Sequence, residues 1–347
     1  MKNILLTITF ILILCGCNSH ICNLDNCNED DSISKLIELG YNRDAALKIL
    51  SLKENNMSLL TNDYKKDYEK LLELEDFKEE YLEEYTNTYF DIDTFVYLIN
   101  NKIYTKLDES FKEIYNDKFY IKENTEKYLQ YKEEYSDIRD LVEYVNAKAY
   151  KKGYEEYDNS DTSKDILMIA SKIYYLGEYS PNDLVDVEEG YYILSKPQLR
   201  NEAWINYKTM ADAARNEGIE FYISTSFRSY DFQKTLYNGY LANDSQESVD
   251  TYSSRPGYSD HQTGLAADIR TVDEAFERFT DTKAAKWLKD NSYKYGFIQR
   301  YPDEKQEITG YIPESWHYRY VGKEAAKIIH ENEITFDEYY AYYVENK

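Results

Sequence analysis

The sequence is poor in glycine, proline and histidine, and its cysteines stop early. Of its 347 residues only 12 are glycine, 5 are proline and 4 are histidine. So few glycines and prolines exclude a collagen-like or loop-dominated chain. The last of the four cysteines is Cys27. A folded domain beyond that point is therefore neither stapled by disulfides nor able to use a cysteine nucleophile.

Positive charge is also scarce. The chain has 41 Lys and Arg against 65 Asp and Glu, which gives a formal net charge of −24. Such a chain repels a phosphate backbone, so we exclude nucleic acid as a partner. Hydrophobic residues make up 42% of the chain, enough to build a core, so disorder throughout is excluded. The length exceeds one average domain, and we expect two.

Only one long apolar run is present, from Ile4 to Leu14, and it follows the cation Lys2. It is too short for a stable membrane-spanning helix, but it has the charged start and apolar centre of an export signal. The run ends in Leu14-Cys15-Gly16-Cys17, which resembles the bacterial lipoprotein processing site. On that reading Cys17 becomes the lipidated first residue of the mature protein. An ordinary signal peptide or a short uncleaved anchor is the alternative.

The N-terminal sequence predicts the localisation of the protein. We expect residues 1–16 to be a signal peptide and residues 17–30 a lipidated tether. The mature protein would then be extracellular and anchored to the outer face of the cytoplasmic membrane in a Gram-positive-type bacterium. Whether Cys22 and Cys27 form a disulfide in that tether stays open.

Residues 31–160 have the pattern of helices joined by polar turns. Short helices are expected at Ser34–Leu39 and Ala45–Leu50. Apolar and tyrosine side chains then recur at three- to five-residue steps from Tyr64 to Tyr85, which is typical of helices with a solvated face. This region contains no histidine and no cluster of catalytic residue types. We predict a helical spacer or interaction region.

The pattern changes after the polar stretch Asp158–Ser163, which marks a domain boundary. Residues 161–347 mix helices and strands. The predicted helices are Ala203–Asn216, Tyr230–Leu241, Thr282–Tyr295 and Lys323–Asn332, and the predicted strands are Ile219–Ser224, Leu265–Thr271, Gly296–Tyr301 and Trp316–Val321. This order predicts an α+β fold with a mixed, mostly antiparallel sheet and flanking helices, preceded by an all-α N-terminal region.

Two histidines stand near carboxylates. His261 precedes Asp268 by seven residues, and Glu314 precedes His317 by three. Two imidazoles and one carboxylate can hold a zinc ion and leave a fourth position open. The remaining carboxylate can take a proton from water as it attacks a carbonyl. The spacing alone is weak evidence, because a histidine near an aspartate is commonly a surface or core residue.

Four segments resemble a known family. Residues 253–269, Ser-Ser-Arg-Pro-Gly-Tyr-Ser-Asp-His-Gln-Thr-Gly-Leu-Ala-Ala-Asp-Ile, resemble the metal-binding core of VanY-type D-alanyl-D-alanine carboxypeptidases. Residues 224–233 resemble that family's arginine-bearing segment, and residues 296–302 and 314–322 resemble its closing motifs. The resemblance implies the family's fold, a zinc (Zn2+) cofactor, and removal of the C-terminal D-alanine from peptidoglycan stem peptides in cell-wall remodelling.

The resemblance also assigns the central residues. His261, Asp268 and His317 match the family's zinc ligands. Glu314 matches its general base, which activates the attacking water and then hands a proton to the leaving amine. Arg228 matches the residue that holds the scissile carbonyl oxygen as negative charge develops there, a task suited to a fixed guanidinium.

Further positions bear on substrate binding. Gln233 and Ser259 match positions that line the substrate pocket, and Trp316 is expected at the site, either packed beneath it or touching substrate. Thr225 and Phe227 depart from the glycine and tyrosine that the family often has there. These two changes flank the arginine, so they leave the fine substrate preference open.

Two other functions remain open. One is an L,D-carboxypeptidase of the same fold that acts on tetrapeptide stems, and the other is a non-catalytic wall-binding lipoprotein that only recognises peptide. A serine enzyme is disfavoured, because residues 161–347 contain no Ser-x-x-Lys nucleophile set and their Ser163-Lys164 and Ser171-Lys172 lack that spacing. We expect a monomer whose partners are stem peptides and, through its lipid, the membrane. A pentapeptide ending in D-alanine is not distinguished from one ending in D-lactate.

Overall fold

The computed structural model describes residues 29–52, 60, 67–273 and 276–345. The chain divides into two compact units, Met1–Leu129 and Gln130–Lys347. The predicted signal peptide, Cys17 and the tether up to residue 28 lie outside the described residues. Among the helices that are described, none combines the length and the apolar character needed to cross a membrane.

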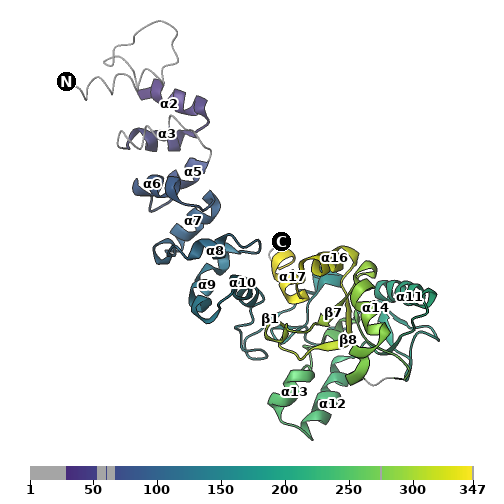
Figure 1. The fold of residues 1–347 in the computed structure, drawn as a ribbon. Helices are drawn as coiled ribbons and strands as arrows, with labels where there is room; N and C mark the ends of the chain where they lie inside the picture. Colours follow the sequence, from purple (N-terminus) through teal and green to yellow (C-terminus); the bar gives the residue numbers. More distant parts are fainter. Residues whose placement is uncertain (1–28, 53–59, 61–66, 274–275, 346–347) are drawn as a thin grey trace. The chain divides into compact units, whose positions relative to one another are not determined.

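The first unit is helical, as predicted (Figure 1). Its described helices are α2 (Glu29–Leu39), α3 (Arg43–Leu50), α5 (Asp67–Leu72), α6 (Glu80–Asn87), α7 (Ile92–Asn100), α8 (Phe111–Tyr115) and most of α9 (Thr125–Tyr131), with 3-10 turns η2 (Tyr104–Lys106) and η3 (Lys122–Asn124). Within the stretch from residue 67 to 85 the helix is interrupted between α5 and α6. The apolar periodicity continues across this break, with Leu74 buried inside it, so periodicity alone could not locate it.

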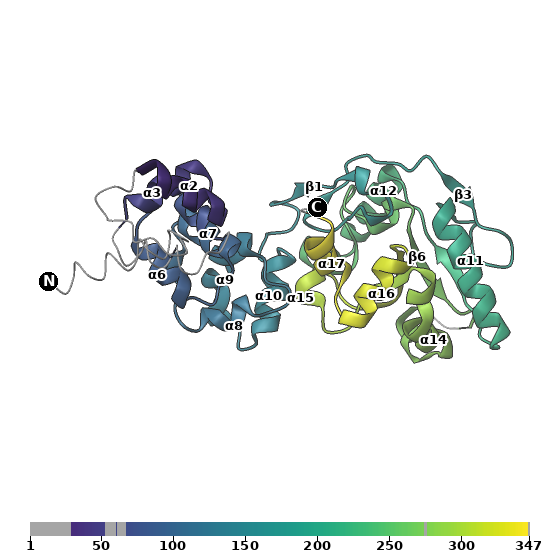
Figure 2. The same cartoon turned by 90° about the horizontal axis from the view of Figure 1, so that it is seen from above.

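The second unit mixes helices with short strands (Figure 1 and Figure 2). Its α-helices are α10 (Ile138–Asn146), α11 (Asn201–Asn216), α12 (Tyr230–Leu241), α13 (Gln246–Tyr252), α14 (Lys283–Asn291), α15 (Gln306–Thr309), α16 (Lys323–Asn332) and α17 (Phe336–Tyr343). Its strands are β1 (Asp158–Asn159), β2 (Tyr174–Tyr175), β3 (Leu184–Asp186), β4 (Gln198–Arg200), β5 (Tyr222–Thr225), β6 (Ala266–Arg270), β7 (Phe297–Tyr301) and β8 (Glu314–Tyr320). Its 3-10 turns are η4 (Lys132–Glu134), η5 (Thr162–Leu167), η6 (Asp260–Thr263), η7 (Phe276–Asp281) and η8 (Ser292–Tyr295).

Residues 130–160 fall in this second unit, although the polar stretch at 158–163 predicts a boundary after them. The reason lies in α10, which contacts α15 and α17. Its residues Leu141, Val142 and Val145 are fully buried, and its Glu143 forms an ion pair with Lys305. The amphipathic helix before the polar stretch therefore covers part of the second unit.

The main sheet has the strand order β5-β6-β8-β7, and every neighbouring pair is antiparallel. Two small pairs accompany it, β1 with β2 in parallel and β3 with β4 in antiparallel orientation. Each strand of the main sheet overlaps one that the sequence predicts, but β5 begins at Tyr222, three residues later than the predicted start at Ile219. The α+β prediction with a mostly antiparallel sheet is confirmed.

The pleat of this sheet gives it two different faces. Ala267, Ile269 and Tyr318 belong to the hydrophobic core that also contains residues of α11 and α14. Successive side chains of a strand point to opposite faces, so Asp268 and His317 lie on the other face. The hydrophobic packing of one face therefore orients polar side chains on the other.

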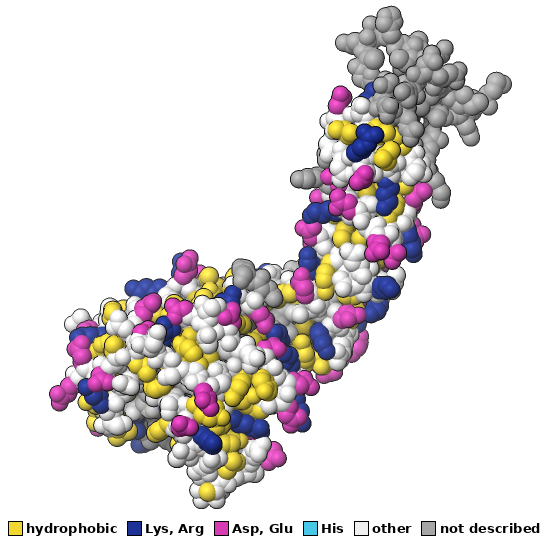
Figure 3. Space-filling view, turned by 180° about the vertical axis from the view of Figure 1, so that it is seen from behind, with side chains coloured by type: hydrophobic (Ala, Val, Ile, Leu, Met, Phe, Trp, Pro, Cys, Tyr) yellow, Lys and Arg dark blue, Asp and Glu magenta, His cyan; other side chains and the backbone are white. Residues whose placement is uncertain are grey.

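The surface carries mixed charge. On the face of the second unit visible in Figure 3, acidic and basic side chains are scattered among polar and apolar ones. On the described residues of this face no broad basic patch is visible. That distribution is typical of a solvated surface.

A tight turn at Gly264 yields a stability prediction. Gly264 follows η6 with a φ of 70°, and an added Cβ would lie 3.0 Å from side-chain atoms of Arg200, Leu184 and Pro181. Because both the positive φ and the crowding penalise alanine, Gly264→Ala should lower the free energy of unfolding by about 1–3 kcal/mol. All three tryptophans lie in the second unit, so tryptophan fluorescence during urea unfolding measures this change.

Gly239 provides the matched control. It lies inside α12, and an added Cβ there would meet nothing within 4 Å. Gly239→Ala should leave the free energy of unfolding unchanged or raise it by about 0.5–1 kcal/mol, because alanine favours a helix interior over glycine. Equal losses in the two variants would contradict the importance of the turn at Gly264.

Candidate active site

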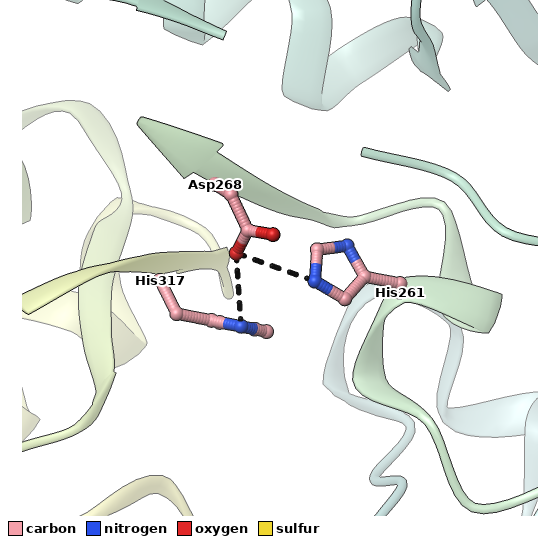
Figure 4. A group of neighbouring side chains, drawn as sticks. All are labelled: His261, Asp268 and His317. Carbon is pink, nitrogen blue, oxygen red and sulfur yellow. Dashed lines mark ion pairs between the residues drawn. The ribbon is translucent and has the colours of Figure 1, made fainter. Parts of the chain in front are cut away.

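Strand pairing and one short turn bring three side chains together. The register of β6 and β8 places Asp268 directly opposite His317, and His261 comes from η6, just before β6. Nε2 of His261 and Nδ1 of His317 each lie 3.3 Å from the same oxygen, Oδ1 of Asp268 (Figure 4). All three side chains are buried, and their facing atoms lie within 4.8 Å of one another. These are the three residues that the resemblance identifies as zinc ligands.

The residues present fit a zinc ion. Asp268 Oδ1 is buried and accepts no hydrogen bond, whereas Oδ2 accepts one from Arg228 at 3.0 Å. A buried carboxylate oxygen without a partner is costly, and a cation would satisfy it. Two ligand atoms at tetrahedral angles around zinc lie about 3.3 Å apart. The two distances of 3.3 Å at Asp268 Oδ1 match that separation.

Hydrogen bonds on the outer side of each ring determine which of its nitrogens could bind a metal ion. Nδ1 of His261 lies 2.8 Å from the carbonyl oxygen of Ser226. Because a carbonyl only accepts, Nδ1 carries the hydrogen and Nε2 keeps its lone pair. In His317 the outer nitrogen is Nε2, which lies 3.3 Å from Oδ2 of Asp260, so Nδ1 is free to bind. Such outer partners are usual for histidines that bind metals.

The electrostatics of the two rings also favour a cation. Burial, and then the nearby Arg228 cation, lower the pKa of His261 to about 4, so its ring is neutral at pH 7. Burial alone would lower the pKa of His317, but the negative charges of the three carboxylates around it, Asp260, Asp268 and Glu314, raise that pKa well above its ordinary value. The negative charge of three carboxylates around one ring favours binding of a cation at this site, and a divalent ion would supply that positive charge.

Glu314 and Arg228 border the three candidate ligands. Glu314 begins β8, and its Oε2 lies 3.2 Å from Nδ1 of His317. Burial raises the pKa of the Glu314 carboxyl, a change that makes a carboxylate a stronger base. Arg228 follows β5 and keeps 19% of its side chain exposed while it donates to Asp268. A buried carboxyl group and a cation thus border the three candidate ligands, the first beside His317 and the second beside Asp268.

A pocket with a volume of about 440 Å³ opens over these residues. Every residue of the second unit that the sequence predicts for the site lines this pocket: Arg228, Gln233, Ser259, His261, Asp268, Glu314, Trp316 and His317. Cys17, the predicted lipidation site, lies outside the described residues. The pocket gives the two histidines and their neighbours access to a ligand of small-peptide size.

The predicted substrate-binding residues differ in what they offer. Gln233 donates through Nε2 to the carbonyl oxygen of Ser254 at 2.7 Å, while its Oε1 is buried and accepts no hydrogen bond in the described structure. Ser259 is 2% exposed and stands just before η6. Trp316 is half-buried, packs against the hydrophobic core and still lines the pocket.

Several lining residues are not among those that the sequence predicts for the site. The pocket is also lined by Leu236, Tyr240, Tyr252, Tyr301, Tyr311 and Ile312. With 39 tyrosines in the chain, a tyrosine in a pocket cannot be told from one in the core by pattern. Asp260 is different, because it adjoins His261, and its adjacency to a predicted ligand is the signal that could have identified it.

Comparison with known proteins agrees with the geometry. The family model described as "VanY: D-alanyl-D-alanine carboxypeptidase" matches residues 196–323. The "Putative carboxypeptidase YodJ" of Bacillus subtilis (strain 168) is 42% identical over 205 residues, which are 57% of this chain and 74% of that protein. A "D-alanyl-D-alanine carboxypeptidase" of Enterococcus faecium is 31% identical over 232 residues, which are 60% of this chain and 72% of that protein.

A solved structure is similar as well. The structure of the LdcB LD-carboxypeptidase shares 39% sequence identity with this chain at a TM-score of 0.51, and the match covers 54% of this chain and 90% of that one. The segment matched by the family model extends from before Arg228 to beyond His317 and so includes the whole ligand set. The chain belongs to the VanY D-alanyl-D-alanine carboxypeptidase family.

Proposed function

We propose that this protein is a zinc-dependent carboxypeptidase that removes the C-terminal D-alanine from peptidoglycan stem peptides in cell-wall remodelling. The observation that carries the proposal is Asp268 Oδ1, unsatisfied and 3.3 Å from a nitrogen of each of two histidines, in a pocket that also holds Glu314. Relatives named D-alanyl-D-alanine carboxypeptidase support the choice of substrate.

The chain's own groups divide the chemistry. His261, Asp268 and His317 would hold the zinc ion. An ion bound there supplies Lewis acidity, which lowers the pKa of water and polarises a carbonyl group. Glu314, whose Oε2 lies 3.2 Å from Nδ1 of His317, takes the proton of the attacking water. Glu314 then gives that proton to the amine of the leaving D-alanine.

Other residues position the substrate. The guanidinium of Arg228, held at 3.0 Å by Asp268, would stabilise the negative charge that develops on the scissile carbonyl oxygen. Gln233 and Ser259 would hold polar groups of the peptide, and the unpartnered Oε1 of Gln233 calls for a hydrogen-bond donor. Trp316 would border the peptide while its buried part supports the sheet.

A second candidate function is L,D-carboxypeptidase activity on tetrapeptide stems. Its support is the structural similarity to the LdcB LD-carboxypeptidase, 90% of whose chain is covered at 39% identity. The two candidates use the same ligand set and differ in the configuration of the residue before the scissile bond. Pocket residues beyond the ligands therefore decide between them.

Muropeptides of two lengths distinguish the candidates. The mature protein is incubated with pentapeptide and with tetrapeptide muropeptides, and the products are weighed by mass spectrometry. D,D activity predicts loss of one alanine from the pentapeptide only. Activity on the tetrapeptide alone would establish the second candidate in place of the first.

Metal removal accompanies that assay. A chelator should abolish hydrolysis, and added zinc should restore it, because the ligand set holds the ion reversibly. His261→Ala should be inactive with or without added zinc. Hydrolysis that survives both treatments would contradict the zinc mechanism.

Glu314→Gln separates proton transfer from metal binding. The substitution keeps the shape of the side chain but removes its basicity, so kcat should fall by about 10²–10⁴-fold while bound zinc is retained. Zinc content and kcat are measured on the same preparation. Glu331→Gln in α16, where the side chain is exposed, is the matched control and should be fully active. Loss of zinc from Glu314→Gln in proportion to the loss of activity would contradict the assigned role.

We propose further that Cys17 is lipidated and holds the protein at the outer face of the cytoplasmic membrane. The support is the apolar run from Ile4 to Leu14, followed by Leu14-Cys15-Gly16-Cys17. An enzyme tethered there stands beside its cell-wall substrate.

Fatty-acid labelling tests this anchor. Cys17→Ser should abolish incorporation of a labelled fatty acid during growth, because the lipid-accepting thiol is gone. Cys22→Ser, five residues further on, should be labelled like the unsubstituted protein. Equal labelling of Cys17→Ser and Cys22→Ser would exclude Cys17 as the anchor.

A further inference from the structure

Four charged side chains lie buried behind the metal ligands. Asp260, Arg300, Arg319 and Asp337, called here the buried ionic network, are exposed by 2%, 0%, 0% and 5% respectively. They come from η6, β7, β8 and α17. Charged residues are rarely this buried unless they are paired, and each of the four forms an ion pair with another member of the network.

Asp260 connects the network to the metal site. Its Oδ2 lies 3.3 Å from Nε2 of His317. Its Oδ1 accepts a hydrogen bond from Nη1 of Arg319, and Nε of Arg300 lies 4.0 Å from that same oxygen. The carboxylate is thus held between a ligand histidine on one side and two guanidinium groups on the other.

Arg319 is fixed by the backbone around it. Its Nη2 donates to the carbonyl oxygens of Ile166 and Met168, at 3.0 Å and 2.6 Å. Its Nε donates to the carbonyl oxygen of Tyr320 at 3.0 Å. Every guanidinium nitrogen is therefore engaged, and the one directed at Asp260 has no freedom to turn away.

Arg300 extends the network to the C-terminal helix. Both terminal nitrogens of Arg300 donate to the carboxylate of Asp337, the second residue of α17. Arg300 Nε is buried and has no hydrogen-bond partner in the described structure, and the nearest carboxylate oxygen to it is Oδ1 of Asp260, at 4.0 Å. Two acids and two bases make the network neutral as a whole, which is the condition for tolerating ions in a protein interior.

We propose that Asp260 and Arg319 are positioning residues for the metal centre. Arg319 orients the Asp260 carboxylate, and Asp260 accepts the Nε2 hydrogen of His317, which leaves the Nδ1 lone pair facing Asp268. The pair of Arg300 and Asp337 supports the same carboxylate from the side of α17. This inference rests on the proposed function, because it concerns the affinity of the ligand set for zinc.

The acceptor character of Asp260 is the chemical basis of this inference. An ionised carboxylate can only accept, so it fixes the hydrogen of His317 on Nε2. An asparagine could direct its oxygen to Arg319 and its NH₂ group to Nε2. That arrangement places the ring hydrogen on Nδ1, where zinc binding needs a lone pair.

The test compares zinc affinities, measured by competition with a chelator of known affinity, in proteins shown by tryptophan fluorescence to be folded. Asp260→Asn should weaken zinc binding by about 10–100-fold, the usual effect of losing an outer partner of a ligand histidine. Arg319→Lys keeps the charge but not the fork of donors, and should weaken zinc binding less, in the same direction. It gives the same test where Asp260→Asn does not fold.

Asp183→Asn is the matched control. Asp183 accepts from Nε of Arg200 at 2.8 Å and 3.1 Å in a partly buried ion pair outside the network. Its loss should leave zinc affinity unchanged. Unaltered zinc affinity in Asp260→Asn, or an equal loss in Asp183→Asn, would overturn the inference. Failure of the unsubstituted protein to bind zinc would overturn the proposed function and this inference with it.

Discussion

The antiparallel pairing of β6 with β8 is the constraint on which the site depends. It sets Asp268 opposite His317, and the core packing of Ala267 and Tyr318 keeps both polar residues on the opposite face. A slip of one residue would exchange the two faces of a strand. The hydrophobic core under α11 and α14 therefore fixes the register, and the register places Asp268 and His317, two of the three candidate zinc ligands, next to each other.

The parts of the fold and the site that could be predicted are those that a local sequence pattern determines. Strong helical periodicity predicted the bounds of α11 and α12 to within two residues, and apolar runs predicted the location of the four strands of the main sheet. His261 and Asp268 share one short block, as do Glu314 and His317. Only the family resemblance predicted that these two blocks lie close together in the fold. Neither block by itself determines the strand register that places them side by side.

The remaining features depend on tertiary contacts that leave no pattern. Strands of two or three residues such as β1 and β3 are too short for a period to be read. Helix α17 is rich in tyrosine and buries Asp337 and Glu338, so it lacks an ordinary polar face. Arg300 and Arg319 lie in segments that resemble family motifs, but only their pairing inside the fold shows that they are buried and why.

Because the buried ionic network must stay neutral, it restricts which substitutions this protein can accumulate during evolution. Loss of one charge, at Arg300 for example, leaves an opposite charge unpaired in the interior and lowers the free energy of unfolding by about 3–5 kcal/mol. Changes at residues in contact are not additive, so a second change at Asp337 can relieve the first. Homologous sequences should therefore vary at these positions in compensating pairs, and the order in which the two changes occur decides whether the intermediate protein still folds.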